Sequence, residues 1–159
     1  MSVVRLIFLL LVANGAPVLA RRLLGARLAC PLDGGLRLAD HRPLLGRSKT
    51  VRGVTAALLV TPAAALAVGL GIQVGLLVAG SAMAGDLLAS FVKRRLGIAP
   101  SGRALGLDQI PESLLPALAV QSSLHLGPAD VLTAVAGFTA AELLLSRILY
   151  QVHLRKRPY

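Results

Sequence analysis

Long apolar segments occupy most of this chain of 159 residues and restrict it to folds solvated by lipid or by other apolar helices. Five segments can be marked, at residues 2–20, 53–69, 71–92, 113–126 and 129–150. A helix needs about 20 apolar residues to cross a bilayer, with a range of about 17 to 25. The fourth segment is short for this and contains Pro116, although it lengthens if its helix begins near Ile110. We therefore predict an all-α, polytopic bundle with about five transmembrane helices.

The composition favours one integral membrane domain over residues 1–159. Charged residues make up 15% of the chain, against about a quarter in ordinary soluble domains. The mean hydropathy is +0.74, and aromatic residues, at 3%, are too few for an aromatic-rich soluble core. A chain of this length leaves no room for a second domain of useful size beside five spans.

The positions of the cations predict how the chain is oriented. They gather after the first span, after the third and in the tail: Arg21, Arg22, Arg27, Arg37, Arg42, Arg47, Lys49 and Arg52; Lys93, Arg94, Arg95 and Arg103; Arg155, Lys156 and Arg157. The alternate connections, near Leu70 and at 127–130, carry no Lys or Arg. By the positive-inside rule we expect the N-terminus outside and the C-terminus in the cytoplasm, with the protein in the inner membrane of the cell. The net charge of +10 then indicates membrane lipids as partners, with no nucleic acid.

The N-terminal segment has an alternative interpretation as a signal peptide, because one arginine precedes an apolar run that ends in small residues. Arg21 and Arg22 follow at once, which favours a retained span. Cleavage would also remove Asn14, a polar residue that needs a partner inside a bilayer.

A carboxylate stands inside the third apolar segment, in the stretch "GDLLASFVKRRLG". On a helix, Asp86 shares one stripe with Ser90, Lys93 and Arg94 and lies roughly 12 Å below Arg94. A lone ionisable group in a membrane costs at least a few kcal/mol, so a functional role is favoured. The alternatives are an ion pair with Arg147 in the last segment and, for the cations, a topology signal that contacts lipid phosphates.

Two further stretches add groups suited to phosphate chemistry. "SGRALGLDQIPES" supplies Asp108 and Glu112, and Mg²⁺ takes one or two carboxylates together with phosphate oxygens. "LGRSKTVRG" leads into the second apolar segment and offers hydroxyls and cations at a helix N-terminus: Ser48, Lys49, Thr50 and Arg52. It lacks the spacing of a P-loop. The alternative for this stretch is a basic loop that touches anionic lipid.

Four blocks together resemble the CDP-archaeol synthase family, a branch of the membrane cytidylyltransferases that includes the CDP-diacylglycerol synthases. They are "ANGAP", "PLDGG" with "LGRSKTVRG", "GDLLASFVKRRLGI" and "LDQIPES", in order between residues 13 and 113. The third block is similar to the G-D-L-x-x-S-x-x-K-R signature of both branches, and the fourth to the L-D-Q or L-D-R block that follows it. The last two are specific when taken together; the first two are weaker.

The resemblance implies an enzyme that condenses CTP with a lipid phosphate, such as archaetidic or phosphatidic acid, and releases pyrophosphate in phospholipid biosynthesis. It implies Mg²⁺ held by Asp86 and Asp108, with Lys93 and Arg94 completing the catalytic set. Substrate phosphates would be bound by the remaining polar residues of the blocks: Ser48, Lys49, Thr50, Arg52, Ser90 and Arg95.

The chain departs from the family pattern at several positions. Arg47, Ser48 and Val51 stand where the first loop of the family often has aspartate, glycine and tryptophan, and Pro111 stands where a second aspartate is common. Glu112 is adjacent to Pro111 and could substitute for the missing aspartate. The alanine- and arginine-rich composition suits a high-GC bacterium, which leaves acyl and isoprenoid chains both open. Two other classes compete: a non-catalytic membrane protein whose basic loops bind anionic lipid or a partner, and a small transporter that uses Asp86.

Overall fold

The computed structural model describes residues 1–99, 102 and 104–151, the last four by their backbone alone. Arg103, Arg155, Lys156 and Arg157 lie outside the described residues. The described chain is all-helical apart from isolated bridges. Its helices are α1 (Ser2–Leu24), α2 (Val51–Ala67), α3 (Ile72–Arg95), α4 (Gln109–Ala119), α5 (Gln121–Leu124) and α6 (Pro128–Gln151). The predicted all-α class is confirmed.

In the part of the chain that the structure describes, three helices are long and apolar enough to cross a membrane: Ser2–Leu24, Ile72–Arg95 and Pro128–Arg147. The helix α2 is apolar but shorter, with 17 residues. Of the three long helices, α3 is the most buried. Both α1 and α3 extend past the predicted segments by taking in their terminal arginines, whose long side chains can reach away from the apolar part of the helix.

The fourth predicted segment does not form one continuous helix. It is divided into α4 and the single turn of α5, with the break at Val120, whose amide donates to the carbonyl of Pro116. After α5, His125 adopts a left-handed conformation with φ 53° and ends the turn. The eleven residues of α4 cover about 16 Å, or about half of a bilayer core. Polar residues at 121–123 and the proline account for the break, because neither favours a continuous apolar helix.

The helices form one closely packed bundle. The helix α1 contacts α2, α3 and α6, while α4 packs between α3 and α6. Large side chains fill the part of the core far from the connection at residues 25–50, where Leu6, Leu9 and Phe138 are fully buried. At Gly85 the helices α3 and α4 approach so closely that a Cβ would lie 2.2 Å from the carbonyl oxygen of Pro111. Small residues therefore permit the contact that brings α4 beside the middle of α3.

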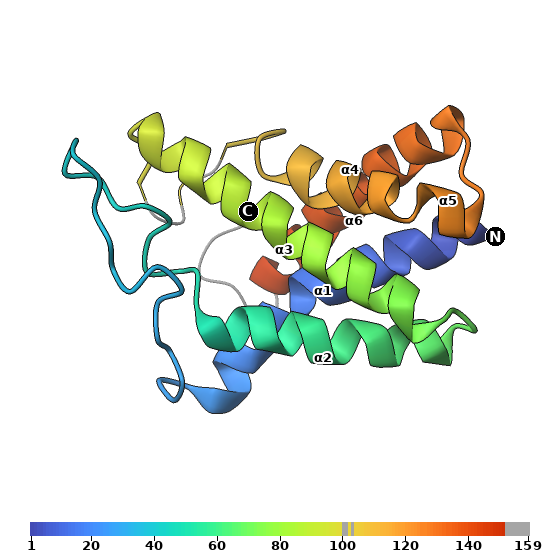
Figure 1. Ribbon diagram of the computed structural model, residues 1–159, viewed down its shortest axis with the longest axis horizontal. Helices are drawn as coiled ribbons and strands as arrows, with labels where there is room; N and C mark the ends of the chain where they lie inside the picture. The colour runs from blue at the N-terminus through green and yellow to red at the C-terminus, as the bar shows by residue number, and fades with distance from the viewer. Residues whose placement is uncertain (100–101, 103, 152–159) are drawn as a thin grey trace.

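The connection at residues 25–50 lies at the same end of the bundle as the C-terminal end of α3, while the N-terminus lies at the opposite end (Figure 1). We call this the loop end. The connection is irregular, with bridges between Pro31 and Thr50 and between Arg37 and Pro43. Arg95 fastens it to α3 by donating to the carbonyl of Pro43 at 2.6 Å.

Candidate active site at the loop end

One face of α3 carries the polar residues that the spacing placed on one stripe. Ser90, Lys93 and Arg94 are buried, with 2%, 9% and 4% of their surfaces exposed, and Asp86 is partly buried two turns earlier. The helix is continuous through this region, so the i, i+4, i+7 and i+8 spacing sets their common direction. The predicted stripe is confirmed as a geometric feature.

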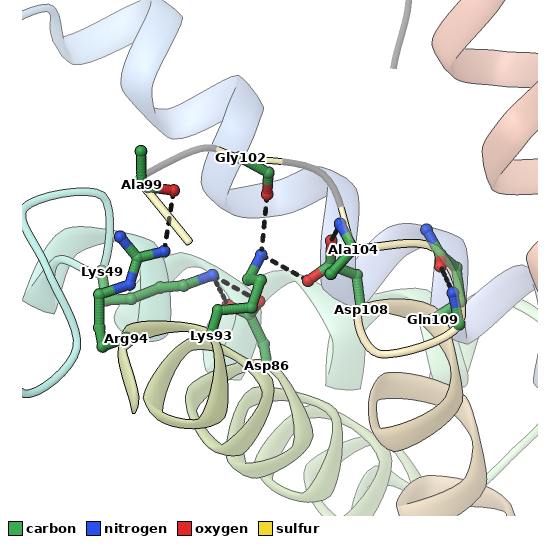
Figure 2. Close-up of polar contacts among 10 residues, drawn as sticks. Lys49, Asp86, Lys93, Arg94, Ala99, Gly102, Ala104, Asp108 and Gln109 are labelled. Atoms are coloured by element: carbon green, nitrogen blue, oxygen red, sulfur yellow. Dashed lines mark hydrogen bonds and ion pairs between the residues drawn. The ribbon is translucent and has the colours of Figure 1, made fainter. Parts of the chain in front are cut away.

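Asp86 forms an ion pair with Lys49, which comes from the first loop (Figure 2). The lysine contacts both carboxylate oxygens, Oδ2 at 2.5 Å. The sequence analysis considered Arg147 as an ion-pair partner of Asp86, whereas in the structure the partner is Lys49. Lys49 directly precedes Thr50, the N-cap of α2. The pair therefore joins the end of the first loop to α3.

A second lysine–aspartate pair lies beside the first. Lys93 Nζ lies 2.5 Å from Asp108 Oδ1, and it also donates to the carbonyl of Gly102 at 3.4 Å (Figure 2). Asp108 stands immediately before α4, and its Oδ2 accepts from the amide of Ala104. The two aspartates of the sequence motifs are thus each held by a lysine at the loop end.

Arg94 is a buried cation with unused donors. Its Nη2 donates to the carbonyl of Ala99 at 3.1 Å. Its Nε and Nη1 are buried and have no hydrogen-bond partner in the part of the chain that the structure describes. Buried polar groups are normally paired, so these two N–H groups indicate a place for an acceptor such as a phosphate oxygen.

Glu112 belongs to the same cluster, although its role was open in the sequence. It is buried in the first turn of α4, and its side chain is hydrogen-bonded to Asp86. Two carboxyl groups in hydrogen-bond contact need a proton or a cation between them. The sequence signal for Glu112 was its position four residues after Asp108, which places it in the first turn of the helix that Asp108 precedes.

Other predicted binding residues contact protein backbone or loop side chains. Arg52 Nη1 donates to the carbonyls of Gly25 at 2.8 Å and Arg27 at 2.7 Å. The Thr50 side chain caps α2 by accepting from the amide of Gly53. Arg95 pairs with Asp40 at 2.7 Å and lies over the Phe91 ring. The side chain of Ser48 is exposed.

Asp33 is a residue that the sequence reasoning missed. Its carboxylate is buried and accepts from the amides of Gly35 at 3.0 Å, Leu45 at 2.9 Å and Gly46 at 3.2 Å. Desolvation raises the pKa of Asp33, but hydrogen bonds from these amides outweigh it and leave the pKa below its ordinary value. The available signal was "PLDGG", since Gly34 and Gly35 both take positive φ and form the turn around the carboxylate.

These features define a class: a polytopic helical membrane protein with a charged cluster suited to anionic ligands at one end of its bundle. The family model described as "CarS-like: CDP-archaeol synthase" matches residues 61–159. Proteins named CDP-archaeol synthase from Aeropyrum pernix and Pyrobaculum calidifontis are 37% and 38% identical to this chain. The alignments cover 94% of this chain and 86% of the first relative, and 93% and 91% for the second. The chain belongs to the CDP-archaeol synthase family.

A solved structure supports the same assignment. It is described as "Structural insight into an intramembrane enzyme for archaeal membrane lipids biosynthesis", and it is similar with a TM-score of 0.75 at 35% identity, over 89% of this chain and 90% of that one. A further relative, CDP-archaeol synthase of Sulfurisphaera tokodaii, is 32% identical over 94% of this chain and 90% of its own length. The relatives named here are archaeal, so the bacterial source expected from the composition is unsupported.

Proposed function

We propose that this protein is a CTP-dependent cytidylyltransferase that converts a membrane lipid phosphate into a CDP-activated lipid. Family membership supports the reaction class, and the names of the relatives favour an ether-linked isoprenoid lipid over an acyl lipid. The observation that carries the proposal is the buried Arg94 guanidinium, two of whose nitrogens have no partner among the described residues, beside two lysine–aspartate pairs. A non-catalytic lipid-binding protein or a transporter needs no such cluster at the loop end.

The reaction is an in-line displacement at the α-phosphorus of CTP. An oxygen of the lipid phosphate forms the new P–O bond, the bond to the bridging oxygen between the α- and β-phosphates breaks, and pyrophosphate leaves with that oxygen. Both reactants are anions, so the protein must offset their repulsion and hold them in line. Arg94 and Lys93 are placed to do this for the phosphates of the nucleotide.

The two lysines also have a role toward the carboxylates. Lys49 and Lys93 neutralise Asp86 and Asp108, which would otherwise be costly charges near an apolar core. When the triphosphate binds, each lysine can exchange part of its contact with aspartate for phosphate oxygens. Ser90, on the same face of α3, can donate its hydroxyl to the same group. Thr50, Arg52 and Arg95 act by shaping the loop that carries Lys49.

Mg²⁺ fits the donor chemistry of this cluster. Asp86 and Glu112 are two carboxyl groups in contact, and Asp108 is the carboxylate paired with Lys93 in the same cluster. The described residues contain no group of three or more side chains arranged to hold a metal ion. Mg²⁺ takes one or two carboxylates from a protein and completes its shell with phosphate oxygens and water. When bound, Mg²⁺ would neutralise charge on the phosphates during transfer. Asp86 and Asp108 are the proposed ligands.

We also propose one domain of five crossings, with α4 and α5 together forming the fourth. The N-terminus would lie outside and the loop end in the cytoplasm, where CTP is available. The basic segments at the loop end support this orientation in the cytoplasmic membrane.

The test is a transfer assay with purified protein in detergent, Mg²⁺, CTP labelled at the α-phosphate, and a panel of lipid phosphates with ether-isoprenoid or acyl chains. We expect labelled lipid with the wild type and a fall of about 10³-fold or more for Asp86→Asn, because this variant removes both a ligand charge and the partner of Lys49. The exposed-residue variant Arg47→Gln serves as the matched control. Absence of labelled lipid with every acceptor, or equal labelling by Asp86→Asn, would contradict the proposal.

A further inference from the structure

A cleft lies between α1 and α6. The residues that line it are different from those that form the two lysine–aspartate pairs and the Arg94 site. Its volume is about 250 Å³. On α1 its wall is a single helical stripe, with Asn14, Val18 and Arg22 each four residues apart. On α6 the facing stripe includes Phe138 and Glu142, also four residues apart. We call this the α1–α6 cleft.

The cleft is apolar on its open side. Val18, Leu19 and Leu145 line it and are 37%, 55% and 43% exposed, while Phe138 is fully buried and closes its floor. Both helices are membrane-spanning candidates, so side chains exposed on them face lipid. An apolar opening of this kind admits hydrocarbon directly from the bilayer.

The other side of the cleft is polar and lies toward the loop end. Arg22, in the last turn of α1, contributes a cation to the lining, and Glu142 and Ser146 contribute polar groups from α6. The carboxyl of Glu142 lies near enough to Glu112 to repel it, and Glu112 is itself hydrogen-bonded to Asp86. The polar part of the cleft therefore neighbours the candidate active site.

We propose that the α1–α6 cleft holds the lipid phosphate acceptor, with the start of its hydrocarbon chain on the apolar wall and its phosphate at the Arg22 side. This inference rests on the proposed function and names the place of its second substrate. The volume is below the about 300–1,000 Å³ of sites that enclose a drug-sized ligand, which suits the head-group end of a lipid whose chains remain in the bilayer. A cation at the rim of an apolar cleft selects an anionic lipid over a neutral one.

Gly15 allows the cleft to be filled without disturbing the helix. It lines the cleft, and a Cβ built on it meets nothing within 4 Å, so a larger side chain enters open space. Replacing a helical glycine by leucine favours the helix by up to about 1 kcal/mol, so lost activity in Gly15→Leu would not reflect a weakened α1. The matched control is Gly80→Leu, because Gly80 is an exposed glycine in α3 that also has open space around it and does not line the cleft.

The first experiment measures KM for both substrates in the transfer assay. We expect Gly15→Leu to raise KM for the lipid phosphate by about 10-fold or more while KM for CTP stays within about 2-fold, since misfit in an apolar site costs about 10- to 200-fold. Gly80→Leu should match the wild type. If Gly15→Leu behaves like Gly80→Leu, or raises KM for CTP equally, the acceptor is not in this cleft. Failure of the wild type to label any lipid would contradict the proposed function instead.

The second experiment uses a lipid phosphate that carries a photoactivatable group early in its chain, with labelled peptides identified by mass spectrometry. We expect labelling of residues 11–22 and 138–146, displaced by excess unlabelled lipid phosphate but not by phosphatidylcholine. Arg22→Gln should lower this labelling by about 10-fold, the value of a hydrogen bond to a charged group, while the exposed neighbour variant Arg21→Gln should not. Equal displacement by phosphatidylcholine would mean that the cleft takes only bulk bilayer lipid, which would overturn the proposal.

Discussion

The α3 face and the first loop carry similar residues, and the structure uses them differently. On α3, the polar residues of the motif point in one direction and lie in one buried cluster. In the loop, Lys49 reaches that cluster, whereas Arg52 and Thr50 bind backbone groups around the start of α2. In a continuous helix the spacing of the residues fixes the direction of their side chains, while in a loop the direction depends on what the backbone packs against.

The three consecutive cations of α3 show the same contrast within one turn. Lys93 and Arg94 are buried and turn toward Asp108 and Ala99, whereas Arg95 turns to Asp40 and Pro43 of the first loop. Successive residues on a helix differ by about 100° in direction, so neighbours of the same charge take different roles. Arg95, predicted as a phosphate ligand, is therefore better explained as the residue that fastens the loop.

The largest effect expected among the three cations of α3 separates Arg94 from Arg95. Arg94→Gln should lower kcat/KM for CTP by about 10²-fold, because it removes a buried charge placed for phosphate. Arg95→Gln should lower it less than about 5-fold and should instead lower the melting temperature, since only its loop contacts are lost. Steady-state kinetics and thermal melting of the two variants make the comparison. Equal kinetic losses would mean that Arg95 also acts at the site.

The second prediction tests the close contact that brings α4 to the α3 face. Gly85→Ala should destabilise the protein by about 1–3 kcal/mol, because the new Cβ would clash with the backbone of Pro111 and one helix must move. The same change at Gly80, which has open space, should be neutral or slightly stabilising. Thermal melting in detergent measures both. Unchanged stability in Gly85→Ala would show that α3 and α4 are not held at this distance.

The helices could be predicted from the sequence because apolar length and charge spacing determine them locally. Residues 71–92 and 129–150 were placed within a few residues of α3 and α6. The break in residues 113–126 was not predicted, because it depends on Pro116 and the polar residues 121–123 acting together, and an apolar average conceals them. The number of crossings and their orientation remain predictions.

The candidate site was only partly predictable for a related reason. Asp86, Lys93 and Arg94 followed from helix spacing, but the pairing of Asp86 with Lys49 joins residues far apart in the sequence. Asp33 was missed because two of the amides that bind it, those of Leu45 and Gly46, are brought to it by the fold, and "PLDGG" indicates only the local turn. Glu112 was considered only as a substitute, since its contact with Asp86 depends on how closely α4 approaches α3.

The third prediction asks whether Arg52 stabilises the loop or binds substrate. Arg52→Gln should lower stability by about 1–2 kcal/mol, because two carbonyls at the end of α1 lose a charged donor. KM for CTP should change less than about 3-fold in the fraction that remains folded, since a loss of loop packing is not a loss of a phosphate contact. The exposed Arg47→Gln is the matched control for removing a loop cation. A rise in KM without a fall in melting temperature would restore the binding role predicted from the sequence.

The smallest effect expected is a local opening of the first loop in acid. The pKa of Asp33 is lowered in the folded protein, so the stability that it contributes is present above its ordinary value of 3.8 and is lost as the pH falls through the lower, folded-state value. Hydrogen exchange of the Leu45 and Gly46 amides, corrected for the intrinsic effect of pH, should therefore accelerate below about pH 4. In Asp33→Asn this acid-dependent step should disappear, while Asp40→Asn, which alters the contact with Arg95, should retain it. If the acid-dependent step persists in Asp33→Asn, a group other than the Asp33 carboxylate holds the loop segment that carries Lys49.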